Sequence, residues 1–262
     1  MTVRDELTKS EGRLFSVEER DRIRDRVLEM AASDKRIVAG AVVGSLALDE
    51  GDHFSDLDLT FGVADEFSMD DVLEEWTRQI VTEFNAAHLF DVTSGASIYR
   101  VFLLPGCLQF DLSFTPASSF GAIGPKFKLL FGNAVEKPYL STQTVLELFG
   151  FAVHHALRAR FCIERGRTWQ AEYWISSLRD HALAIACHRH GLPVSFGRGF
   201  DHLPTEVLEP FKSALAASLK RDELLRALKA AVDGLLRESV EVQDLAAKVE
   251  PQLRQLTLEW NS

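Results

Sequence analysis

Cysteine is scarce in this chain, with three residues among 262. Their wide spacing fits neither a disulfide framework nor a zinc site, so Cys107, Cys162 and Cys187 are interpreted as buried reduced thiols. Long apolar runs are also missing. No segment approaches the roughly 20 apolar residues of a membrane helix, and the first residues lack the apolar stretch of a signal peptide. These absences predict a cytoplasmic protein with no membrane partner.

Basic residues are fewer than acidic residues, and the net charge is −10. The deficit lies in residues 1–136, which hold 24 acidic and 13 basic side chains, whereas residues 137–262 hold 15 and 16. An acidic surface repels the phosphate backbone and attracts cations, so a nucleic-acid partner is disfavoured and a cationic small substrate is allowed. Solubility alone explains this acidity equally well.

The first half mixes helical and strand-like patterns. Ser16 and Glu19 have the form of a capping box ahead of apolar residues at helical spacing, and Ser68 precedes a second amphipathic run. Short apolar or alternating segments around these helices predict strands. The expected order is a helix at 16–32, strands at 37–43 and 56–61, a helix from Ser68 to Phe84, and strands at 88–93, 97–104, 107–114 and 129–131.

From Thr142 onward the signals are helical. Helices are expected at 142–163, 167–190, 205–219 and 222–248, with Pro251 starting a short last helix. We therefore predict an α+β protein. A small mixed β-sheet domain with flanking helices covers residues 1–138, and an all-α helical bundle covers residues 139–262. The apolar content of the helical half would permit a homodimer.

Three aspartates stand at strand positions where a core residue is not expected. Asp56 and Asp58 are two residues apart, so on a strand both point to one face while Leu57 and Leu59 point to the other. Asp111 lies in a segment whose even-numbered positions are all large and apolar, which turns its side chain away from the core. Like charges on a half-buried strand are costly without a cation, so these acids predict a site for a divalent ion.

A Gly44-Ser45 pair follows the apolar strand, and Ser45 precedes Asp56 by eleven residues. A glycine at such a turn lets the backbone approach a phosphate closely, and the next hydroxyl and amide can donate hydrogen bonds to it. This pair, the Asp56-x-Asp58 motif and Asp111 together resemble the signature of the DNA polymerase β-like nucleotidyltransferases. Chain size, the helical second half and the Arg167-x-Trp169-x-Ala-Glu172 stretch look most like the aminoglycoside and lincosamide nucleotidyltransferases.

This resemblance implies a nucleotidyltransferase domain at residues 1–138 that uses ATP as co-substrate and two Mg²⁺ ions. Two ions about 3.5–4 Å apart can stabilise the attacking and leaving oxygens of nucleotidyl transfer, and oxygen ligands suit magnesium. Asp56 and Asp58 are assigned to both ions, and Asp111 to the ion that activates the acceptor hydroxyl. Gly44 and Ser45 are expected to hold the triphosphate.

Other residues are weaker candidates. Lys126 or Lys128 could pair with the triphosphate, as could Arg165 or Arg167 from the helical half. Glu172 is the preferred general base toward the substrate hydroxyl, with Glu164 and Asp180 as competitors. Solvation is the simpler expectation for the loop acids Asp49, Glu50 and Asp52, and packing or surface positions are the simpler expectation for the pair His154 and His155. Trp169, Tyr173 and Trp174 are expected to be core residues rather than a substrate platform.

The leading hypothesis is an enzyme that transfers AMP from ATP to a hydroxyl of a small molecule and releases pyrophosphate. The acceptor would be a hydroxylated compound that is allowed to be cationic, with aminoglycoside- or lincosamide-like antibiotics as candidates. Two alternatives stay open. One is a nucleotidyltransferase that modifies a protein or another metabolite, and the other is a non-catalytic, antitoxin-like binding module of the same fold.

Overall fold

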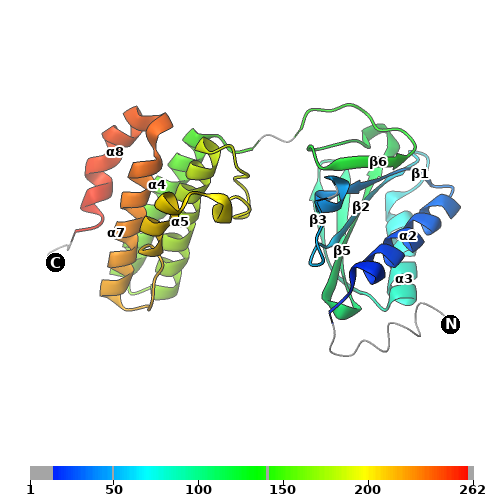
Figure 1. The fold of residues 1–262 in the computed structure, drawn as a ribbon, viewed down its shortest axis with the longest axis horizontal. Helices are drawn as coiled ribbons and strands as arrows, with labels where there is room; N and C mark the ends of the chain where they lie inside the picture. The colour runs from blue at the N-terminus through cyan, green and yellow to red at the C-terminus, as the bar shows by residue number, and fades with distance from the viewer. Residues whose placement is uncertain (1–13, 49, 140–141, 259–262) are drawn as a thin grey trace. The chain divides into compact units, whose positions relative to one another are not determined.

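The structure is a computed structural model that describes residues 14–48, 50–139 and 142–258. The chain divides into two compact units, Met1–Leu140 and Ser141–Ser262, which we call unit 1 and unit 2. The division falls two residues beyond the predicted boundary at residue 138. Asp49, one of the loop acids considered above, lies outside the described residues. Figure 1 shows a sheet with helices in unit 1 and helices alone in unit 2.

Unit 1 contains a six-stranded sheet in the order β3-β4-β5-β2-β1-β6. Strands β2 and β5 run parallel, and the other neighbouring pairs are antiparallel, so the sheet is mixed. This sheet and the helical second unit confirm the predicted α+β class. The strands are β1 (Ile37–Val43), β2 (Leu57–Val63), β3 (Ala87–Ser94), β4 (Ser97–Leu104), β5 (Leu108–Pro116) and β6 (Phe127–Phe131).

Two helices pack against one face of this sheet (Figure 1). The helix α2 (Val17–Ser33) begins with the predicted capping box of Ser16 and Glu19, and α3 (Met69–Phe84) begins after the Ser68 cap. Their apolar sides join alternate residues of the strands in one core, because successive strand residues point to opposite faces. This core includes Ile23, Val27, Trp76, Ile80, Leu57, Leu59, Phe61, Phe110, Leu112 and Phe114. The intervening strand residues, Asp58 and Asp111 among them, point to the opposite face.

Unit 2 is built from α4 (Val145–Glu164), α5 (Thr168–Arg189), α6 (Thr205–Lys212), α7 (Arg221–Glu238) and α8 (Gln243–Gln255). Helices α4, α5 and α7 pack side by side around a continuous apolar core (Figure 1). The side of α5 that faces this core is apolar, and its buried residues include Ala171, Ile175, Leu178, Ala182 and Ile185.

The predicted ends of the later helices are wrong in two places. α6 stops at Lys212 instead of residue 219, and Arg226 of α7 binds the carbonyl oxygens of Ser213 and Leu215 in the irregular chain that follows (2.5 and 2.9 Å). The expected helix at 222–248 is broken after Glu238. The buried hydroxyl of Ser239 lies 2.9 and 2.8 Å from the carbonyl oxygens of Leu235 and Leu236, which satisfies the end of α7. Pro251 therefore lies inside α8 and does not start a helix.

Two further expectations concern exposure. Cys162 and Cys187 are buried as predicted, but Cys107 is exposed, because it lies in the turn between β4 and β5 with a positive φ of 62°. In the part of the chain that the structure describes, no helix combines the length and apolar character needed to cross a bilayer.

Candidate active site

The parallel pairing of β2 with β5 brings the predicted acids together. Asp58 is the register partner of Asp111, and Asp56 immediately precedes β2. One carboxylate oxygen from each of the three residues lies within 4.8 Å of the other two, and all three side chains are half-buried. Three hard oxygen donors at this separation fit a magnesium ion, which prefers carboxylate and water oxygens. We call Asp56, Asp58 and Asp111 the acidic triad.

Gly44 packs directly against the acidic triad. It ends β1 with a φ of 71°, a conformation that favours glycine, and begins the 3₁₀ helix η1 (Gly44–Leu48). A Cβ atom at this position would lie 2.2 Å from Oδ2 of Asp58, closer than real atoms approach. Ser45 follows at once and is half-buried. The turn predicted to hold a triphosphate is therefore next to the predicted metal ligands.

Arg20 organises the loop that leads into Asp56, and sequence reasoning missed it. Its side chain is almost fully buried, and Nη1 donates to the carbonyl oxygens of Asp52 and Ser55 at 2.7 and 3.0 Å. The loop also closes on itself, because Ser55 Oγ accepts from the Asp52 amide at 2.9 Å. The sequence contained one indication of this role. Arg20 precedes Ile23 and Val27 on the buried side of α2, where a charged residue is unexpected.

The acidic triad concentrates negative charge in a half-buried site. Burial raises the pKa of the Asp111 carboxyl, the hydrogen bond from Gln109 Nε2 to Oδ1 (2.9 Å) opposes this, and the charge of Asp56 raises the pKa further. A bound divalent cation would reverse the effect, because it stabilises the ionised carboxylates. The chemistry of the donor set and its electrostatics both fit Mg²⁺.

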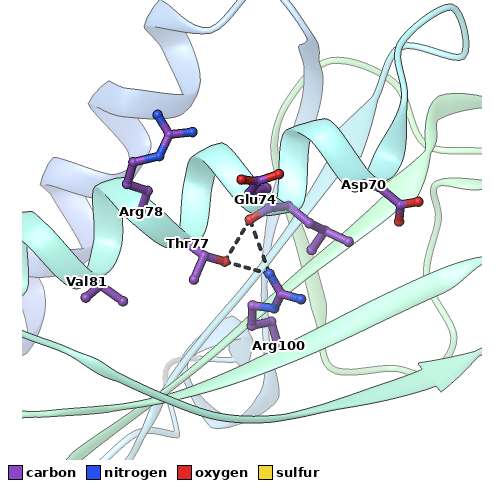
Figure 2. Close-up of a pocket in the computed structure, with 7 residues that line it drawn as sticks. Asp70, Glu74, Thr77, Arg78, Val81 and Arg100 are labelled. Carbon is purple, nitrogen blue, oxygen red and sulfur yellow. Dashed lines mark hydrogen bonds between the residues drawn. The ribbon is translucent and has the colours of Figure 1, made fainter.

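A cavity in unit 1 lies apart from this site. It measures about 560 Å³ and lies between α3 and Arg100 of β4, on the face that the helices cover (Figure 2). The guanidinium of Arg100 is already engaged. It binds Thr77 Oγ1 at 2.6 Å and the Leu73 carbonyl oxygen at 3.2 Å, and both oxygens of Asp91 at 2.8 and 2.6 Å. This hydrogen bonding ties α3 to the sheet edge and leaves the arginine little capacity for an anion.

Of the lysine candidates, Lys128 lies in the edge strand β6 and Lys126 immediately precedes that strand. Lys128 of β6 is paired with Val42, whose side chain belongs to the helix-covered core, and directly opposed residues of an antiparallel pair share a face. Lys126 forms an ion pair with Glu50, 2.7 Å between Nζ and Oε2. The role of Lys128 at a triphosphate remains a prediction.

The remaining candidates lie in unit 2. Arg167 is exposed and stands at the N-cap of α5, Arg165 caps the end of α4, and half-buried Glu172 accepts a hydrogen bond from Ser176 Oγ at 2.6 Å. Their proposed roles remain predictions. The expectation that nearby aromatic residues are core is wrong for Trp169 and Tyr173, which are 78% and 58% exposed. It holds better for Trp174, which packs against the apolar core and stacks near His155.

Comparisons with known proteins add little to this description. No family model matches the chain, and no curated protein matches it. Among solved structures it is similar to an aminoglycoside 6-adenyltransferase from Bacillus subtilis, at 14% sequence identity over 94% of this chain and 100% of that chain, with a TM-score of 0.40. A likeness of this strength assigns no activity. The functional argument therefore depends on the geometry of the site.

Replacing Gly44 tests its contact with Asp58. Gly44→Ala should lower the free energy of unfolding by more than the roughly 1–3 kcal/mol expected for backbone strain alone, because the new Cβ also displaces the Asp58 carboxylate. It should also weaken Mg²⁺ binding measured by calorimetry. Gly95→Ala is the matched control, since Gly95 has a φ of 59° and a Cβ added there would meet nothing within 4 Å. Equal losses in the two variants, with Mg²⁺ binding intact in both, would contradict the contact.

The raised pKa of Asp111 gives a dependence of stability on pH. Its pKa is higher in the folded protein than in the unfolded chain, so its contribution to stability is greatest below the unfolded pKa and is lost as the pH rises through the folded pKa. Asp111→Asn should therefore raise the melting temperature at pH 7 in EDTA, and the gain should shrink toward about pH 4, where carboxyls protonate. Saturating Mg²⁺ should stabilise the wild type, by about 2.7 kcal/mol at a hundredfold excess over Kd, and the variant less.

Asp34→Asn is a control for which the opposite change in melting temperature is expected. Burial alone would raise the pKa of Asp34, but hydrogen bonds from Arg36 and Trp76 outweigh it and lower the pKa. Its stabilisation is therefore present above the unfolded pKa and is lost as the pH falls through the folded pKa, so Asp34→Asn should destabilise at pH 7. A lower melting temperature for Asp111→Asn at pH 7 without metal would contradict the raised pKa of Asp111.

Proposed function

We propose that the chain is a magnesium-dependent nucleotidyltransferase. The observation that carries this proposal is the acidic triad on neighbouring parallel strands, with the Gly44-Ser45 turn packed against Asp58. A structural ion site needs no phosphate-binding turn, and a phosphate site alone needs no three carboxylates. Their combination suits a reaction in which a triphosphate is held and cleaved at one place.

The reaction is the transfer of AMP from ATP to a hydroxyl of a small molecule. The acceptor oxygen forms a bond to the α-phosphorus while the bond to the bridging oxygen of pyrophosphate breaks, and the hydroxyl proton passes to a base. Two Mg²⁺ ions would supply the positive charge that lowers the acceptor pKa and stabilises the departing pyrophosphate. Asp56 and Asp58 would ligate both ions, and Asp111 the ion beside the acceptor.

The other residues position the reactants. The backbone at Gly44 and the hydroxyl of Ser45 would donate to the β- and γ-phosphate oxygens, and Lys128 or Arg167 would add positive charge. Glu172 is proposed as the base that takes the acceptor proton. The acidic first half favours a cationic acceptor, so hydroxylated aminoglycoside- or lincosamide-like antibiotics are the first compounds to test.

The Asp58→Asn variant tests the metal-dependent chemistry. Incubation of the wild type with labelled ATP, Mg²⁺ and a panel of hydroxylated antibiotics should release pyrophosphate and label an acceptor. Asp58→Asn should lower the rate by more than about a hundredfold, since even residues that only orient metal ligands cost 10–100-fold. Asp25→Asn, on the exposed side of α2, is the control and should match the wild type. ATP binding without product or pyrophosphate for any acceptor would favour the non-catalytic binding module.

Glu172→Gln tests the general base separately. The variant keeps a side chain that can hydrogen-bond to Ser176 but cannot accept a proton, so kcat should fall while the KM for ATP stays unchanged. The low-pH limb of the pH–rate profile should also disappear. Unchanged turnover and an unchanged profile would remove Glu172 from the mechanism, and Glu164→Gln and Asp180→Asn would then be measured in the same way.

A further inference from the structure

Unit 2 contains a cavity of about 410 Å³ between the α4–α5 pair and the loop after α5. Its apolar wall includes Leu148 of α4, Ala184 of α5 and Phe200. Its polar lining includes Asp180, His181 and Ser195. This size is typical of small-molecule sites, and the polar part of the lining is about as extensive as the apolar part.

Phe196 at this cavity is held in an unfavourable conformation. Its φ is 59°, which is a genuine outlier for a bulky residue, and its side chain is 91% exposed. Gly197 follows with a φ of 71°, so two consecutive residues are left-handed. The contact given for the exposed ring is the guanidinium of Arg198, whose Cζ lies 5.5 Å from the ring centroid, and the left-handed backbone lowers stability. Strain of this kind is typically kept at ligand sites, where the side chain has a use that the free protein does not show.

Asp180, His181 and Ser195 can each accept a hydrogen bond in the cavity, and Gln143 completes the polar lining. His181 Nδ1 lies 2.8 Å from the carbonyl oxygen of Ser177. A carbonyl can only accept, so Nδ1 donates in this hydrogen bond, and Nε2 is the ring nitrogen that can accept one. Asp180 is a carboxylate whose hydrogen bonds from Arg179 both go to Oδ1 (2.9 and 2.8 Å). A carboxylate, an imidazole nitrogen and the Ser195 hydroxyl together match a ligand that donates several hydrogen bonds and carries positive charge.

We propose that this cavity binds a small molecule with a primary ammonium group and an apolar or aromatic body. The ammonium donates to Asp180, His181 Nε2 and Ser195. The body lies against Leu148 and Phe200, and the Phe196 ring covers it from the loop. This site needs neither Mg²⁺ nor ATP, so it stands whether or not the chain transfers nucleotides.

Binding of phenethylamine hydrochloride to the full chain tests the proposal, with phenethyl alcohol as the uncharged analogue of similar shape. Saturation-transfer NMR and calorimetry, in EDTA and without nucleotide, should show saturable binding of the amine and affinity at least about tenfold weaker for the alcohol, because a charged hydrogen bond is lost. Absence of saturable amine binding, or equal affinity for both compounds, would overturn the proposal.

Two variants locate the site. Asp180→Asn should weaken the amine about tenfold and leave the alcohol unchanged, whereas Asp244→Asn, on exposed α8, should change neither. Phe196→Gly should weaken both compounds and raise the melting temperature, because glycine adopts this φ without strain. A fall in melting temperature would show that Phe196 is a packing residue. That result, or an unaltered amine affinity in Asp180→Asn, would contradict the site.

Discussion

The candidate active site depends on one backbone constraint, the parallel pairing of β2 with β5. This register sets Asp58 opposite Asp111. A slip of one residue would turn one strand's acid toward the helix-covered core and its leucines or phenylalanines toward solvent. Leu57, Leu59, Phe110 and Leu112 are fully buried under α2 and α3. The apolar core therefore specifies the register, and the register in turn specifies where the acids meet.

This arrangement separates stability from chemistry across the thickness of the sheet. Burial of large side chains on the covered face favours folding, while the other face holds three carboxylates that repel one another. Burial, and to a smaller extent the charge of Asp56, raises the pKa of the Asp111 carboxyl, and this direction is the measurable sign of that cost. A bound divalent ion would offset this cost, so Asp111, whose ionisation lowers the stability of the free protein, would also be one of the residues that hold the ion.

Local sequence patterns predicted much of this and failed for identifiable reasons. Alternation along strands predicted that Asp56, Asp58 and Asp111 leave the core and share a metal site, but strand partners are a long-range property, so the pairing of Asp58 with Asp111 could not be derived from it. The contact of Gly44 with Asp58 could not be read from a Gly-Ser pair. The roles of Arg20 and Ser239 were missed because each binds backbone carbonyls, whose positions only the folded chain defines. Trp169 was wrongly expected in the core, because tryptophan side chains are usually buried whereas this one is exposed.

The buried position of Arg20 has a consequence for local stability. Its guanidinium joins α2 to the Asp52 and Ser55 carbonyls, immediately before Asp56. Undocking of α2 would therefore release the loop and free Asp56 from its partners in the triad. By linkage, an ion that binds the ordered triad must suppress this opening. The amides of the first helix, although they touch no ligand, should then exchange their hydrogens more slowly whenever the triad is occupied.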